Sequence, residues 1–142
     1  LGSAIAEGYP TGTVISTGHN PVVAQGGHLN YSGDEHTVFT APSDQNIVLT
    51  DVVLTGGNTN YDCRGQSRVT LQLASGLVLG VFAVDQRAAQ QSQTGSIVAH
   101  YDSGLPVPAG DSVLIRTDGN YASCGSSYHF VDYSISGYLA QP

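Results

Sequence analysis

Short runs of aliphatic, β-branched and aromatic residues, separated by clusters of Gly, Pro, Asn and Ser, extend along the whole chain. Such runs are typical of β-strands bounded by turns. The best helical candidate, Asp85–Gln91, covers at most about two turns, which is short for a helix of a globular protein. We therefore expect a chain built from strands.

About eight strands are predicted, and 142 residues make one domain. Their number and spacing are typical of a β-sandwich or barrel. We predict an all-β, antiparallel β-sandwich of jelly-roll type, with residues 1–30 as a flexible N-terminal arm and first strand and residues 31–142 as the sandwich. The predicted strands are Thr13–Val23 (interrupted by Gly18 and Pro21), Glu35–Thr40, Ile47–Thr55, Arg68–Leu73, Leu77–Val84, Ser96–Tyr101, Ser112–Thr117 and Tyr128–Leu139.

The charge balance excludes two classes of partner. Lys and Arg together number 4 against 11 Asp and Glu, which gives a formal net charge of −7. A nucleic-acid-binding protein needs cations to neutralise phosphates, and anionic membrane surfaces attract the same residues. We expect no nucleic-acid partner. We also expect no membrane span, because no apolar stretch has the length of a transmembrane helix.

Two cysteines, Cys63 and Cys124, stand in polar, loop-like runs. Free cysteine prefers the core, whereas an even count in polar loops fits a disulfide in an exported protein. We predict one intrachain Cys63–Cys124 bridge and a secreted protein, extracellular or on the cell surface. Two unrelated free thiols are the alternative.

Four predicted connections are long and polar: Ala24–Asp34, Gly56–Ser67, Asp85–Gly95 and Asp118–Ser127. They are the first, third, fifth and seventh connections, and alternate connections of a jelly roll lie at opposite ends of the sandwich. We expect all four at one end, together with both cysteines. Loops gathered on a rigid scaffold are where binding sites usually lie.

The predicted fifth strand, Leu77–Val84, is apolar on both faces, although a jelly roll places it at a sheet edge. An apolar edge invites aggregation unless something covers it. We expect cover from the N-terminal segment or from another subunit, and we predict a homo-oligomer. The residues that point away from the core are either Leu77, Leu79, Val81 and Ala83 or Val78, Phe82 and Val84.

The N-terminal segment offers a second contact, because a flexible apolar arm can add as a strand to a neighbour's open sheet edge. An ordinary first strand with a frayed terminus is the alternative. The candidate subunit-interface residues, from the arm and the fifth strand, are Ile5, Val14, Ile15, Val22, Val23, Val78, Phe82 and Val84.

No catalytic motif emerges. The histidines lack zinc-site spacing, although His100 and His129 could meet across a sheet, and no nucleophile elbow or carboxylate pair stands out. We predict no enzyme activity, no resident metal and no cofactor. Surface calcium held by Asp62, Asp118 and Asn120 is the one alternative.

Tyrosines beside polar residues in the two cysteine loops point to a different possibility. Exposed tyrosines can stack on sugar rings while neighbouring Asn and Asp bind hydroxyls, although the same residues would also serve a subunit contact. Asn30 begins an N-glycosylation sequon. The candidate ligand-binding residues are Tyr61, Asp62, Asn120, Tyr121 and Tyr128.

Two C-terminal stretches are similar to a known family. Pro108–Ile115, with its Gly-Asp-Ser-Val core, and Tyr133–Leu139, with its Ser-Gly-Tyr-Leu end, resemble two strands of C1q/TNF-like jelly-roll heads. The aromatic positions of the middle of such heads are not recognisable here. The resemblance implies a jelly roll, often trimeric, used in extracellular assembly or ligand recognition without catalysis.

Together these features predict a non-enzymatic extracellular structural protein that associates with itself, as the subunit of a filament, surface layer or adhesive head. Low charge suits close packing of identical subunits, because like charges repel. A carbohydrate-binding module or lectin that uses the long-loop end is one alternative. A viral coat or decoration protein is another.

Overall fold

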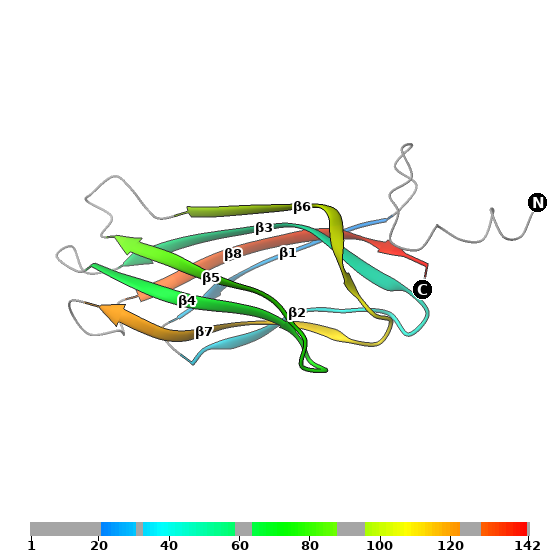
Figure 1. Ribbon diagram of the computed structural model, residues 1–142, viewed down its shortest axis with the longest axis horizontal. Coiled ribbons are helices and arrows are strands. Elements are labelled where there is room, and N and C mark those ends of the chain that lie inside the picture. The colour runs from blue at the N-terminus through cyan, green and yellow to red at the C-terminus, as the bar shows by residue number, and fades with distance from the viewer. Residues whose placement is uncertain (1–20, 31–32, 59–63, 88–95, 123–128, 142) are drawn as a thin grey trace, which may run out of the picture.

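The computed structural model describes residues 21–30, 33–58, 64–87, 96–122 and 129–141. These residues form two packed four-stranded antiparallel sheets, in the orders β1-β8-β3-β6 and β2-β7-β4-β5 (Figure 1). The predicted all-β jelly-roll sandwich is confirmed. The strands are β1 (Val22–Leu29), β2 (Glu35–Thr40), β3 (Asn46–Asn58), β4 (Arg64–Leu73), β5 (Val78–Arg87), β6 (Ser96–Val107), β7 (Ser112–Ala122) and β8 (His129–Ala140).

The core lies between the sheets and follows the two-residue period of the strands. In β8, Val131, Tyr133 and Ile135 are buried, whereas the intervening Asp132 and Ser134 are exposed. The second sheet contributes mainly from β4 and β7. Its largest buried members include Val69, Leu71, Val113 and Ile115.

Strand β3 lies inside its sheet, between β8 and β6, and its apolar side chains belong to two buried clusters. Leu49 and Val52 both belong to the core although they stand three positions apart, because a register shift between Leu49 and Asp51 changes which residues face inward. Val48 instead joins Tyr138 and Ala140 in a second buried cluster. The apolar residues of β3 do not alternate with polar ones because the bulge shifts the inward-facing positions and because Val48 is buried in a second cluster.

Of the predicted first strand, Thr13–Val23, residues 13–20 lie outside the described residues. The predicted long connection Ala24–Asp34 is wrong, because β1 extends from Val22 to Leu29 and pairs with β8 along its whole length. The glycines that predicted a loop here are needed for packing, because a Cβ at Gly27 would overlap the ring of Tyr133. The first connection is therefore short.

The strand ends beside the other long connections lie at one end of the sandwich, as predicted. Register partners show this directly: Asn58 pairs with His129, Gly65 with Ala122 and Thr55 with Ser96. The strands reach further into these connections than the sequence predicted. This extension leaves shorter loops than expected.

Short turns and hydrogen bonds hold the opposite end. The β4–β5 hairpin is tight, with the Gly76 N–H donating to the Leu73 carbonyl at 2.9 Å and Gly76 at φ 116°. The Asp111 carboxylate accepts from the Ser75 hydroxyl at 2.6 Å and from the Ser112 N–H at 2.8 Å. These bonds lower the pKa of Asp111, with the Ser75 hydroxyl the larger cause.

In the described ranges, no helix has the length and apolar character needed to cross a membrane.

Candidate assembly surface

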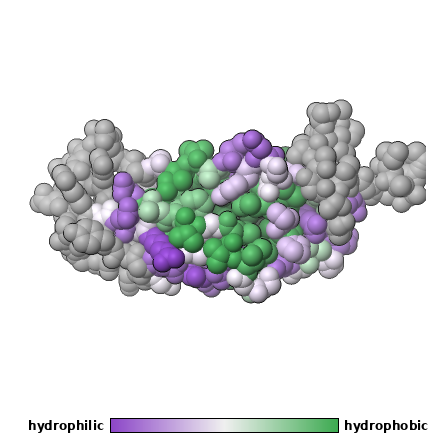
Figure 2. Space-filling model, viewed as in Figure 1, coloured by the Kyte–Doolittle hydropathy of each residue, from purple (hydrophilic) through white to green (hydrophobic). Residues whose placement is uncertain are grey.

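Four of the five exposed large hydrophobic side chains of the described residues lie on one side of the sandwich. The five are Val22, Leu77, Val78, Val81 and Val98, and all except Val22 lie on or directly beside β5 and β6. Figure 2 shows an apolar patch on the face that carries these two strands. Contiguous apolar surface of this kind marks an interaction site more often than scattered exposed residues do.

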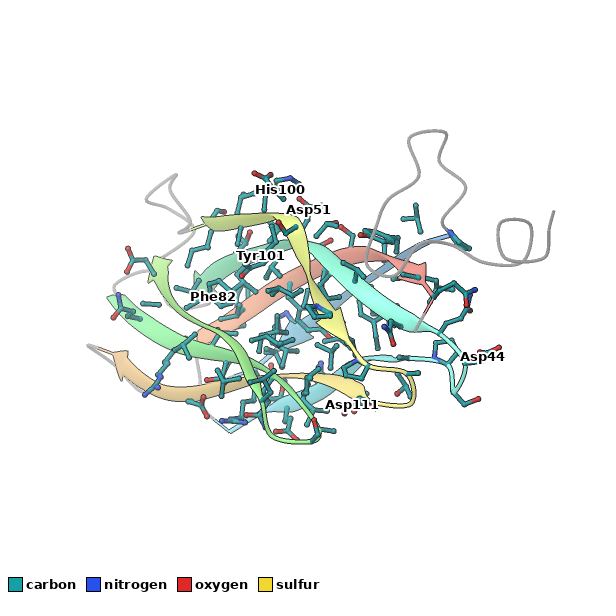
Figure 3. The ribbon with its side chains drawn as sticks, turned by 45° about the vertical axis from the view of Figure 1, so that its right-hand side comes forward. Asp44, Asp51, Phe82, His100, Tyr101 and Asp111 are labelled. Atoms are coloured by element: carbon teal, nitrogen blue, oxygen red, sulfur yellow. The ribbon has the colours of Figure 1, made fainter. Side chains whose placement is uncertain are left out.

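A row of half-buried side chains fills the space between the edges of the two sheets. Leu79 and Phe82 from β5, and Ile97, Ala99, Tyr101 and Leu105 from β6, pack against the core from this side. The Tyr101 hydroxyl lies 3.7 Å from where a Cβ on Gly80 would stand. Figure 3 shows Tyr101 and Phe82 between β6 and β5.

We call this region the β5–β6 edge surface. It consists of Leu77, Val78, Val81, Phe82, Val98 and Tyr101.

The backbone of both strands is also open along this side. β5 ends one sheet and β6 ends the other, and among the described residues β5 pairs only with β4 and β6 only with β3. An unpaired, apolar strand edge is a template for pairing with another chain. The prediction of an apolar edge strand is therefore confirmed for the fifth strand, and β6 extends that edge.

One predicted interface residue lies elsewhere, because Val84 is fully buried. Phe82 packs against the core and is only half-buried, so it also contributes to the β5–β6 edge surface. A register shift opposite Leu71 and Gln72 gives β5 one extra residue. This bulge turns Val78 outward together with Val81, which combines members of the two alternative sets.

The N-terminal candidates divide in a similar way. Ile5, Val14 and Ile15 lie outside the described residues. Val22 is 78% exposed at the start of β1, whereas Val23 is half-buried against the core. Val22 therefore stands on the side of the sandwich away from β5 and β6.

A polar cluster borders the β5–β6 edge surface on the first sheet. His100 of β6 lies with its Nδ1 2.7 Å from Asp51 of β3 and its Nε2 3.1 Å from Asp102. Figure 3 shows His100 and Asp51 together above the bend of β6. Both ring nitrogens face carboxylate oxygens, which only accept hydrogen bonds, so the doubly protonated imidazolium fits this site.

The electrostatics follow this geometry. The hydrogen bond and charge of Asp51 raise the pKa of His100, with a smaller contribution from Asp102. The hydrogen bonds from His100 and from the Thr50 hydroxyl lower the pKa of Asp51. Both groups are largely exposed, so solvent screens the attraction.

All four arginines of the chain belong to strands of the second sheet, Arg64 and Arg68 to β4, Arg87 to β5 and Arg116 to β7. Arg116 donates to Asp118 at 2.7 Å, and Asp118 also accepts from the Thr70 hydroxyl. Burial alone would raise the pKa of Asp118, but these bonds and the arginine charges outweigh it and lower that pKa.

The predicted ligand-binding residues are largely beyond what the structure describes. Cys63, Cys124, Tyr61, Asp62 and Tyr128 lie outside the described residues, so the disulfide and the sugar-stacking tyrosines stay predictions.

The remaining ligand candidates fall on strands. Asn120 and Tyr121 lie near the end of β7, with Ser67 and Gln66 of β4 as register partners. Asn30, the sequon residue, is exposed, and its backbone N–H donates to Asp34 at 2.9 Å. In the described part of the chain, no group of three or more His, Cys, Asp or Glu side chains could hold a metal ion.

The Asp51–His100–Asp102 cluster was missed by the sequence reasoning, which considered His100 and His129 as neighbours. The two histidines instead flank β3 from different strands, β6 and β8. Asp102 could have been found, because residues i and i+2 of a strand share a face. Asp51 depends on the β3–β6 register, which no local pattern encodes.

No protein-family model matches the sequence, and no curated protein matches it significantly. Among solved structures, the chain is similar to the acid-stable capsid of Helicobacter pylori bacteriophage KHP30, with a TM-score of 0.55 and 11% identity over 85% of this chain and 90% of that chain. It is also similar to the cyanophage Pam1 capsid (TM-score 0.49, 21% identity, 97% and 96% covered) and the Ralstonia phage GP4 capsid (0.47, 13%, 88% and 86%). At 11% identity, the first likeness shows a shared fold.

Proposed function

We propose that this chain is a structural subunit of a virus particle, a coat or decoration protein that works by associating with copies of itself. Support for the class comes from the fold, which the chain shares over most of its length with a phage capsid chain of nearly the same extent. A fold alone does not define a function, so the proposal rests on a surface feature as well.

The observation that carries the proposal is the β5–β6 edge surface. A sandwich that functions as a monomer gains nothing from two adjacent open strand edges lined by exposed valines. A subunit of a closed shell needs such surfaces, because neighbours bury them on assembly. The proposal assigns no catalytic step to the chain.

A filament, surface layer or adhesive head would need the same self-association, so the shape of the assembly separates these alternatives from a shell. The test is native molar mass by light scattering over a wide concentration range, with electron micrographs of the same sample. We expect a defined oligomer that forms closed particles or rings. Open fibres would favour the filament, and a monomer at every concentration would overturn the proposal.

A further inference from the structure

Charge is distributed unevenly on the two sides of the β5–β6 edge surface. The β4–β5 strand pair contains three arginines and one aspartate, a net charge of +2. The β3–β6 pair contains Asp51 and Asp102 and no Arg or Lys. Its two carboxylates give −2, and the imidazolium form of His100 reduces the net charge to −1. The apolar surface therefore has a basic flank on one sheet and an acidic flank on the other.

From this we propose that the β5–β6 edge surface binds a second copy of this chain, related by a two-fold axis parallel to the strands. The inference deepens the proposed function, on which it rests, by naming the surface and the orientation. Rotation about such an axis sets β5 of one copy opposite β6 of the other, and this contact occurs twice.

Charge complementarity selects this axis over the perpendicular one. With the axis parallel to the strands, the basic β4–β5 pair of each copy faces the acidic β3–β6 pair of its partner. A two-fold axis perpendicular to the strands would instead set basic against basic and acidic against acidic. Like charges across a contact disfavour association, whereas complementary charges set the orientation.

The strand directions allow backbone pairing about this axis. β5 and β6 run in opposite directions, because the end of β5 and the start of β6 lie at the same end of the sandwich (Figure 1). Rotation about an axis parallel to the strands preserves each direction, so the facing strands are antiparallel. Antiparallel edges can form a regular hydrogen-bonded ladder, which would join each sheet of one copy to the opposite sheet of its partner.

The exposed valines provide a matched pair of variants. Val81 is 49% exposed in the β5–β6 edge surface, and Val22 is 78% exposed on β1. We expect Val81→Asp to raise the dimer dissociation constant by at least about tenfold, because it places a carboxylate in a desolvated contact. Val22→Asp should leave that constant unchanged. Circular dichroism and thermal melts verify that both variants fold.

A charge exchange tests the orientation. Arg68 is exposed on the basic flank, and Asp102, 94% exposed, lies on the acidic flank. We expect Arg68→Glu and Asp102→Arg each to weaken dimerisation several-fold in low salt, and the double variant to recover most of the loss. The measurement is sedimentation equilibrium at low and high salt, where screening should reduce all these differences.

The outcomes separate this inference from the proposed function. A wild-type dimer lost in Val81→Asp but kept in Val22→Asp, with rescue by the charge exchange, supports the inference. Equal behaviour of the two valine variants, or additive loss in the double charge variant, overturns it. If Val81→Asp still forms the wild-type particles, the proposed function stands and the inference fails. A dimer that never forms larger assemblies would contradict the proposed function alone.

Discussion

Among the described residues, both sides of this sandwich end in strands that pair on one edge only, yet the two sides differ in strand length and chemistry. On one side, β1 has 8 residues and β2 has 6, and their exposed positions include Gln25, His28, Glu35 and Thr37. On the other side, β5 has 10 residues and β6 has 12, with Val78, Val81 and Val98 exposed. Short strands and polar or charged side chains are how proteins protect an edge from pairing. Apart from the exposed Val22 at the start of β1, the β1–β2 side is protected in this way, and the β5–β6 side is available to a partner.

The largest expected effect on stability concerns the sheet β2-β7-β4-β5, which extends from one side of the sandwich to the other. Cys63 and Cys124 lie outside the described residues, but the β4–β7 register pairs Gln66 with Tyr121 and Gly65 with Ala122. The Cys63–Cys124 bridge predicted from the sequence would join the connection before β4 to the connection after β7.

We therefore expect the double variant Cys63→Ser/Cys124→Ser to lose about 3–4 kcal/mol of unfolding free energy, because the bridge closes a long loop in the unfolded chain. Chemical denaturation measures the loss, and mass spectrometry of the unreduced protein detects the bridge. Two alkylatable thiols in the unreduced wild type would show that the bridge is absent.

The next effect separates packing from association at the two edges. Phe82 of β5 and Phe39 of β2 are both half-buried aromatic residues that pack against the core. We expect Phe82→Ala and Phe39→Ala to cost about 2 kcal/mol of stability each, from lost apolar contact. Only Phe82→Ala should also weaken self-association, as measured by sedimentation velocity. Equal weakening by both variants would remove the distinction between the edges.

The smallest expected effect is the pH dependence of the stability that Asp51 and His100 contribute on the acidic flank. The pKa of His100 is raised by Asp51, so its stabilising contribution is full below the unfolded pKa of about 6.5 and is lost as pH rises through the folded-state pKa. The pKa of Asp51 is lowered, so its contribution is full above about 3.8 and is lost as pH falls through its folded-state pKa.

The Asp51–His100 pair should therefore stabilise the fold most between about pH 4 and 6.5. His100→Gln should flatten the wild-type change in denaturation midpoint between pH 5.5 and 8, and a proton NMR titration should place the His100 pKa above that of a free histidine. A pKa at or below the free value would contradict the bridging geometry.

The sequence predicted what depends on local pattern. The number of strands and the apolar character of the fifth strand follow from the short apolar runs and the turn residues between them. The sequence-based prediction was wrong where contacts between residues far apart in the chain determine the local structure. The sequence pattern predicts a loop at Gly27. The role of this glycine is to leave room for the ring of Tyr133, which lies against it only because β1 pairs with β8.

The candidate surface shows the same division. That Leu77–Val84 forms an apolar edge was predictable, but which side chains point outward was not, because one bulge in β5 changes the phase of alternation. The contribution of β6 and the acidic cluster with Asp51 depend on tertiary register. A strand pattern identifies the edge, and only the paired sheets identify the surface.

Backbone hydrogen exchange on the two sides, followed as the protein concentration is raised through self-association, tests the central claim most directly. The account predicts that amides of β5 and β6 become protected as the oligomer forms, whereas amides of β1 and β2 exchange as before. Protection confined to β1 and β2, or an assembly that forms with β5 and β6 still exchanging at the monomer rate, would contradict it.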